Sequence, residues 1–177
     1  IGEILSVKCS SLSSIKNILR TYLNFTMKFG NDYLATQDDC DQCSQKLLQS
    51  QLFNSNKETV RSLVIDSILQ EKHPTTLYVT LNFLLQDGRN YEPTFEMMKH
   101  KGCFPRLLEL INFVDKENLA FLSLLLKLMH EMSWCQHLPA EDLRQVNDEL
   151  IITLLNMIEE LSCDAEDPYH YSVIRVL

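Results

Sequence analysis

The stretch YEPTFEMMKHKGCFPRLLELINFV, residues 91–114, is the part of the sequence that decides the fold. Pro93 begins a short predicted helix that runs to Lys101 and is closed by Gly102. Pro105 begins a second helix, in which apolar residues recur at spacings of three and four. A short helix, a tight turn and a longer helix in succession are typical of stacked helix pairs.

The same helical spacing covers nearly all of the remaining chain. Gly, Pro, Asn and Asp residues interrupt it and mark the ends of the predicted helices. The further predicted helices span residues 12–30, 40–54, 55–72, 74–88, 115–132 and 139–161.

Two of these helices, those over 55–72 and 74–88, carry predicted end signals. Ser55 and Glu58 have the spacing of a capping box, Pro74 suits a first helical turn, and Gly88 is the expected C-cap. The helix that follows Asp115 has almost no polar face, so we expect it to be buried on most sides. The leucines expected in the core are Leu122, Leu125, Leu126, Leu128 and Leu155.

These patterns predict an all-α fold with antiparallel neighbouring helices, in a single domain over residues 1–177. Two arrangements fit the sequence: a closed bundle, and an armadillo- or HEAT-like α-superhelix of stacked antiparallel helices. The rhythm of residues 91–114 favours the stack, although no repeat of fixed length is visible.

Composition and charge exclude several classes of protein. Of the 177 residues, 45% are hydrophobic and only four are Gly, and no two glycines have the spacing of a phosphate-binding loop. The net charge of −8 argues against a nucleic-acid partner. The longest apolar run, residues 119–132, is too short and too often interrupted to cross a membrane. Residues 138–177 hold nine acidic residues against two arginines and form either an acidic docking surface or a solvated helix face.

No arrangement of residues points to catalysis, a metal or a cofactor. Cys40 and Cys43 have a Cys-x-x-Cys spacing, but zinc needs further ligands, and a redox pair would follow a β-strand. We expect the six cysteines to be free thiols, most of them at or beside apolar helical positions. His130 lies in the most apolar predicted helix, where a buried structural histidine is the simpler interpretation. We therefore expect a protein that is not an enzyme, with no cofactor.

Three stretches of the sequence carry a recognisable pattern: NSNKETVRSLVIDSILQ (54–70), FLLQDGRNYEPTFEMMKHKGCFPRLLELI (83–111) and LPAEDLRQVNDELIITLLNMIEELSCDAEDPYHYSVIRVL (138–177). These stretches resemble the leucine-rich domain of the WISH/DIP family, of the fungal Dip type. The box DPYHY at residues 167–171, followed by VIR at 173–175, is the most specific element of the resemblance. In relatives, Asn is common at the position of His170.

The resemblance implies an armadillo-like domain that binds and activates the Arp two/three complex, the actin-nucleating assembly, without a preformed mother filament. The linear filaments that result would seed branched networks in cortical actin patches at sites of endocytosis. It also implies a cytoplasmic protein, with further helices after residue 177. The alternative is a helical adaptor for another client, such as a small GTPase or a peptide.

Two charged groups are the candidate partner-binding residues. Either could contact the complex through complementary charge. The basic group is Lys99, Lys101 and Arg106, and the acidic group is Glu141, Asp142, Asp148 and Glu149.

Overall fold

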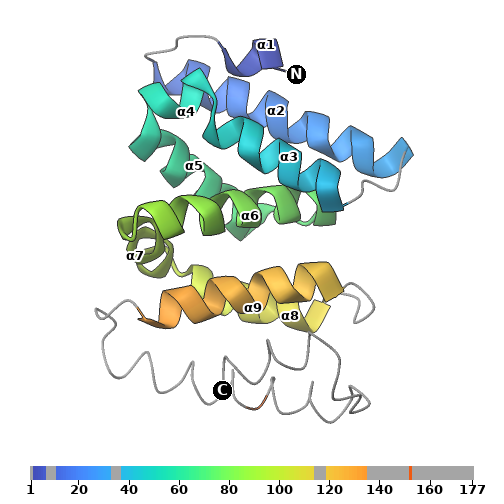
Figure 1. Cartoon of the computed structure of the whole chain (residues 1–177), viewed down its shortest axis with the longest axis vertical. Helices are drawn as coiled ribbons and strands as arrows, with labels where there is room; N and C mark the ends of the chain where they lie inside the picture. Colours follow the sequence, from blue (N-terminus) through green and yellow to red (C-terminus); the bar gives the residue numbers. More distant parts are fainter. Residues whose placement is uncertain (1, 7–10, 33–36, 114–118, 135–151, 153–177) are drawn as a thin grey trace. The chain divides into compact units, whose positions relative to one another are not determined.

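Helices form all of the secondary structure in the part of the chain that the structure describes. The computed structural model describes residues 2–6, 11–32, 37–113, 119–134 and 152, and no strand occurs among them (Figure 1). The prediction of an all-α fold is confirmed, whereas the stacked superhelix stays a prediction. The helices are α1 (Gly2–Leu5), α2 (Leu12–Asp32), α3 (Gln37–Leu48), α4 (Gln51–Ser55), α5 (Lys57–Gln70), α6 (Pro74–Asn90), α7 (Pro93–His100), α8 (Cys103–Phe113) and α9 (Leu119–Trp134).

The chain divides into two compact units, Ile1–Thr94 and Phe95–Leu177. The first contains α1 to α6 and the start of α7, and the second contains α8 and α9. The prediction of a single domain over residues 1–177 stays a prediction. None of the described helices is both long and apolar enough to cross a membrane.

Within the first unit, helix α6 packs against α2, α3 and α5, and Figure 1 shows it beside α3 and α5. Its middle turns bury the apolar run that includes Leu81, Phe83 and Leu84, all of them inaccessible to solvent. Thr80 is equally buried, and its hydroxyl donates to the Thr76 and Leu77 carbonyls of the same helix. An interior helix can therefore hold a threonine without leaving its hydroxyl unpaired.

Polar side chains also join α6 to α3. Asn82 Nδ2 donates to Asp41 Oδ1 at 2.7 Å, and Ser44 Oγ lies 3.0 Å from the Val79 carbonyl oxygen, within donating distance. Such bonds are directional, so they fix the rotation of α3 on α6 more closely than apolar contact alone does.

Helices α8 and α9 pack against each other in the second unit. Both helices bury leucines at helical spacing, such as Leu107 on α8 and Leu125 on α9, which are both completely buried. The predicted core leucines Leu122, Leu126 and Leu128 are buried as well, and this prediction is confirmed. Leu155 and Asp115 lie outside the described residues, as does the predicted helix over 139–161 apart from Ile152, which is helical.

The helix predicted over 40–54 is interrupted at Ser50. Ser50 Oγ accepts from the Phe53 backbone N–H at 3.1 Å and donates to the Leu47 carbonyl at 2.6 Å. The serine thereby ends α3 and caps α4, as serine commonly does at a helix N-terminus. The prediction of one continuous helix was wrong because the apolar spacing continues across this break.

Two other predicted helix ends were also wrong. Ser55 is the last residue of α4, and Asn56 is the N-cap of α5, so no capping box forms with Glu58. Gly88 is buried inside α6, which continues to Asn90. Gly102, in contrast, has φ of 73° and ends the α7 turn as predicted, because glycine tolerates this left-handed conformation.

Candidate functional site

The predicted basic group is divided between the end of α7 and the start of α8. Lys99 lies in the last turn of α7, Lys101 in the turn that follows, and Arg106 in α8, and all three are half-buried. Arg106 Nη1 donates to Glu109 Oε2 at 2.8 Å, and both lysines also interact with other groups. Glu109 reduces the positive potential of this group, and its role in binding a partner stays a prediction.

The predicted acidic group lies outside the described residues. Its members are Glu141, Asp142, Asp148 and Glu149.

The first unit contains a buried ion pair that the sequence analysis did not single out, between Arg61 of α5 and Asp87 of α6. Arg61 Nε donates to Asp87 Oδ2 at 2.6 Å, and Nη2 donates to Oδ1 at 2.9 Å. Thr94 Oγ1 also donates to Asp87 Oδ2, at 2.7 Å. The ion-paired side chains are only 7% and 4% exposed, so both charges are withdrawn from water. A bidentate, charge-assisted geometry of this kind offsets part of that desolvation cost.

The local sequence places both charges on faces that are otherwise apolar. Arg61 lies three and four residues before Val64 and Ile65, and Asp87 lies three and four residues after Leu84 and Phe83. Each charge therefore shares a helix face with buried side chains. Opposite charges on the apolar faces of two successive predicted helices were the signal that could have revealed this pair.

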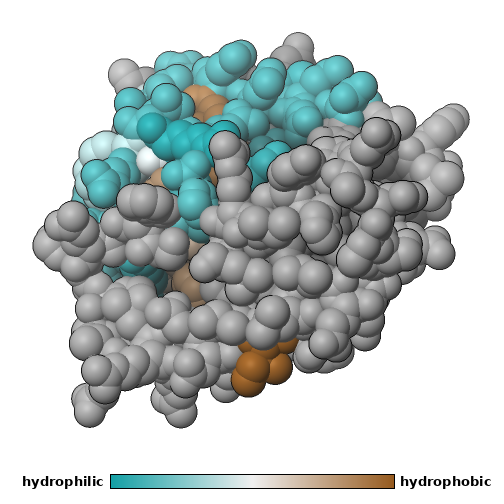
Figure 2. All heavy atoms as spheres, turned by 60° about the horizontal axis from the view of Figure 1, so that its bottom comes forward, coloured by the Kyte–Doolittle hydropathy of each residue, from teal (hydrophilic) through white to brown (hydrophobic). Residues whose placement is uncertain are grey.

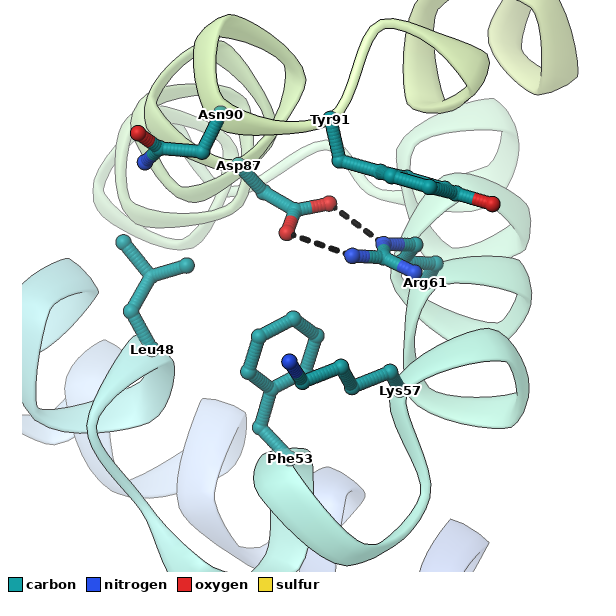
Figure 3. A pocket seen from close by; sticks show the side chains of 7 residues that line it. All are labelled: Leu48, Phe53, Lys57, Arg61, Asp87, Asn90 and Tyr91. Carbon is teal, nitrogen blue, oxygen red and sulfur yellow. Dashed lines mark hydrogen bonds and ion pairs between the residues drawn. The ribbon is translucent and has the colours of Figure 1, made fainter.

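Two aromatic rings lie on opposite sides of the Arg61 guanidinium group. Its Cζ lies 4.2 Å from the Tyr91 ring centroid and 5.4 Å from that of Phe53 (Figure 3). Phe53 in turn meets Phe83 edge to face, with centroids 5.2 Å apart. Cation–π contact stabilises a guanidinium group that is withdrawn from water and holds its plane in one orientation.

A pocket of about 530 Å³ opens beside this ion pair. Arg61 and Asp87 lie on one side of it, Tyr91 and Phe53 present their rings, and Lys57 extends across it near Phe53 (Figure 3). The volume is within the range of sites that take a small molecule or a few side chains of a partner. The pocket is lined by α3, α4, α5, α6 and the residue after α6, all within the first unit.

A second hollow, of about 600 Å³, lies between α2 and α5. Lys16 and Arg20 of α2 lie among its lining residues, as do Asp66 and Glu71 on or just after α5. Both signs of charge are present, so this hollow has no clear preference for one charged ligand.

The Cys-x-x-Cys pair lies on α3, where its thiols are free. Burial raises the pKa of the Cys40 thiol to about 11 and also raises the pKa of Cys43. A reactive cysteine needs the opposite shift, because the thiolate is the nucleophile and the metal ligand. Among the described residues, no three His, Cys, Asp or Glu side chains are grouped so as to hold a metal ion.

The described surface offers little contiguous apolar area. Its large exposed apolar side chains lie on separate elements, and most of the described atoms in Figure 2 are hydrophilic. Scattered apolar residues of this kind are ordinary for a protein surface. The exposed large apolar residues are Leu12, Leu69, Tyr91 and Ile152.

The chain is similar to Protein dip1 of Schizosaccharomyces pombe. The two are 26% identical over 161 residues, which cover 88% of this chain and 43% of the relative. The chain thus spans less than half the length of that protein. No family profile matches the chain, and no solved structure matches it. The likeness agrees with the WISH/DIP resemblance of the three stretches quoted above.

Proposed function

We propose that this chain binds and activates the Arp two/three complex without a preformed mother filament, so that linear actin filaments form and seed branched networks. The observation that carries the proposal is the similarity to Protein dip1, which extends over 88% of the chain. The three stretches that resemble the WISH/DIP leucine-rich domain support it. The proposal includes a cytoplasmic location at cortical actin patches and a role that is not enzymatic.

An all-helical scaffold is compatible with this mode of action. An activator of a conformational equilibrium needs only to bind one state of its target more tightly than the other. A shift from 1:99 to 99:1 requires a difference of about 5.5 kcal/mol in binding free energy. An extended protein interface supplies differences of that size without catalytic groups.

Pyrene-actin assembly tests the proposal directly. Purified chain is mixed with actin monomers and purified Arp two/three complex, without filament seeds or another activator. We expect assembly to accelerate with increasing chain concentration, and the new filaments to be linear by microscopy. The chain without the complex is the control. No acceleration, or equal acceleration without the complex, would contradict the proposal.

The charged groups predicted from the sequence can be tested in the same assay. Reversing Lys99, Lys101 and Arg106 together should weaken binding of the complex if this group is the docking surface. Reversing the four acidic residues, Glu141, Asp142, Asp148 and Glu149, tests the other candidate. The loss of binding caused by either reversal should be largest at low salt and smaller at high salt, because salt screens exposed charges. Folded variants that activate as well as the unchanged chain would exclude both groups as the docking surface.

A helical adaptor for another client is the alternative function. The pocket beside Arg61 favours a client that presents a short peptide segment, because its volume of about 530 Å³ accommodates a few side chains. A pull-down from lysate separates the two functions, since retention of Arp complex subunits is expected only for the first.

A further inference from the structure

The Arg61 guanidinium has hydrogen-bond donors that face no acceptor in the described part of the chain. A guanidinium group carries five N–H donors, and Asp87 takes one from Nε and one from Nη2. No described residue accepts a hydrogen bond from Nη1. Arg61 lines the pocket, so a ligand there would lie beside its guanidinium group (Figure 3).

Lys57 adds a second positive charge to the same pocket. It lies four residues before Arg61 on α5, so both side chains are on one face of the helix. The Lys57 side chain is exposed, and its ammonium group pairs with no described carboxylate. The charged side chains that line the pocket are Lys57, Arg61 and Asp87, which gives it a local charge of +1 in a chain with a net charge of −8.

The remaining walls are apolar or aromatic. Leu48 and Phe53 face the pocket from one side, and the Tyr91 ring lies over Arg61 on another (Figure 3). A ligand with an anionic group next to an apolar group would therefore meet complementary surfaces within one cavity.

We propose that this pocket binds an acidic side chain from a segment of a protein partner. The partner carboxylate accepts hydrogen bonds from Nη1 of Arg61 and from Nζ of Lys57, and a neighbouring apolar side chain packs against Leu48 and Phe53. A carboxylate is favoured over a phosphate because its single negative charge balances the local charge of +1. A dianion would instead leave the pocket with a local charge of −1.

This inference rests on the proposed function only in taking the partner to be a protein. Its test does not use actin or the Arp complex. If the chain binds the acidic peptide but does not accelerate nucleation, only the proposed function is wrong. If the chain accelerates nucleation but does not bind the acidic peptide, only the proposal for the pocket is wrong.

Calorimetry with the whole chain and two synthetic peptides tests the inference. One probe is acetyl-Glu-Leu-Asp-Leu-Glu-amide, and the other replaces its acids by the neutral isosteres Gln and Asn. We expect the acidic peptide to bind, and its affinity to fall as salt is raised from 50 to 300 mM. Equal binding of the two peptides, or no binding of the acidic one, would overturn the proposal.

Two variants of equal charge locate the binding. Lys57→Gln should weaken acidic-peptide binding about tenfold, the size expected for one charge-assisted hydrogen bond. Lys72→Gln removes the same charge from an exposed lysine that does not line the pocket, and should leave binding unchanged. Lys57 is the first residue of α5, where a positive charge opposes the helix dipole, so its removal should not unfold the helix. Equal effects of the two variants would contradict the assignment.

A third measurement distinguishes a carboxylate site from a phosphate site. Inorganic phosphate is titrated into the chain and into Lys57→Gln. Tighter binding of phosphate than of the acidic peptide, lost in Lys57→Gln, would identify the pocket as a phosphate site and overturn the proposal.

Discussion

The contact between α5 and α6 and the contact between α8 and α9 solve the same packing problem with different chemistry. Helices α8 and α9 are in contact and bury leucines such as Leu107 and Leu125, and apolar burial of this kind excludes water but specifies little about register. Helices α5 and α6 also bury apolar residues, yet they include the Arg61–Asp87 pair, whose bonds are satisfied in one arrangement only. Apolar contact thus supplies stability in both places, and the ion pair adds orientation in one.

This difference has a consequence for function. A buried ion pair contributes little net stability, since apolar residues of similar volume often stabilise as well or better. Arg61 and Asp87 are therefore better explained by the orientation that they impose and by the pocket that they line. Burial in the apolar core is sufficient to explain the leucines of α9.

The largest expected effect is that of breaking the ion pair. Asp87→Ala leaves the Arg61 guanidinium buried without its counter-charge and should lower the free energy of unfolding by about 3–5 kcal/mol. Thr94 would lose its acceptor as well. Urea denaturation followed by circular dichroism measures the change.

The double variant Arg61→Met with Asp87→Leu is the control for that prediction. It removes both charges and keeps most of the volume, so its stability should stay within about 1–2 kcal/mol of the unchanged chain. If the double variant is as unstable as Asp87→Ala, the ion pair stabilises the fold directly. The ion pair and the buried leucines of α9 would then both contribute mainly stability.

Truncating a core leucine should have the next largest effect. Leu125 is completely buried on α9, and Leu125→Ala should cost roughly 2–5 kcal/mol through lost apolar burial and the cavity that remains. Unlike Asp87→Ala, this variant changes no charge, so its loss of stability should not depend on salt. Denaturation at two salt concentrations checks this, and a strong salt dependence would contradict the apolar account of α9.

Alkaline pH should weaken the first unit through Cys40. Burial raises the pKa of its thiol from an ordinary 9.0 to about 11 in the folded chain, so the folded state holds the proton more tightly than the unfolded state. This contribution, on the order of 1–2 kcal/mol, is fully present below pH 9 and is lost as the pH rises through 11. Denaturation between pH 8 and 11 should show stability decreasing, and Cys40→Ala should reduce that decrease. If the free energy of unfolding decreases with pH as steeply in Cys40→Ala as in the unchanged chain, Cys40 is not the cause of the decrease.

The smallest effect belongs to the exposed ion pair on α8. Arg106→Gln breaks the pair with Glu109, whose side chain is 59% exposed, and should change stability by less than about 0.5 kcal/mol. Thermal denaturation of this variant beside Asp87→Ala compares an exposed pair with a buried one directly. Similar losses of stability in Arg106→Gln and Asp87→Ala would show that burial does not determine how much an ion pair contributes to stability.

The fold class and most of the helices could be predicted from the amino-acid sequence. Apolar spacing of three and four located α2, α6 and α9, and Pro74 and Gly102 marked helix ends, because these signals act within one or two turns of chain. Ser50 and Gly88 were misjudged because the apolar pattern continues through both positions.

The position of the pocket, in contrast, depends on how the helices pack and could not be predicted from the sequence. Arg61 and Asp87 are 26 residues apart in the chain, and Phe53 and Tyr91 approach Arg61 from two other segments. Each residue alone has an ordinary local explanation as a charge or a ring on a helix. Packing of α5 against α6 brings them within hydrogen-bonding and cation–π distance, and that proximity depends on the fold as a whole, which no local spacing encodes.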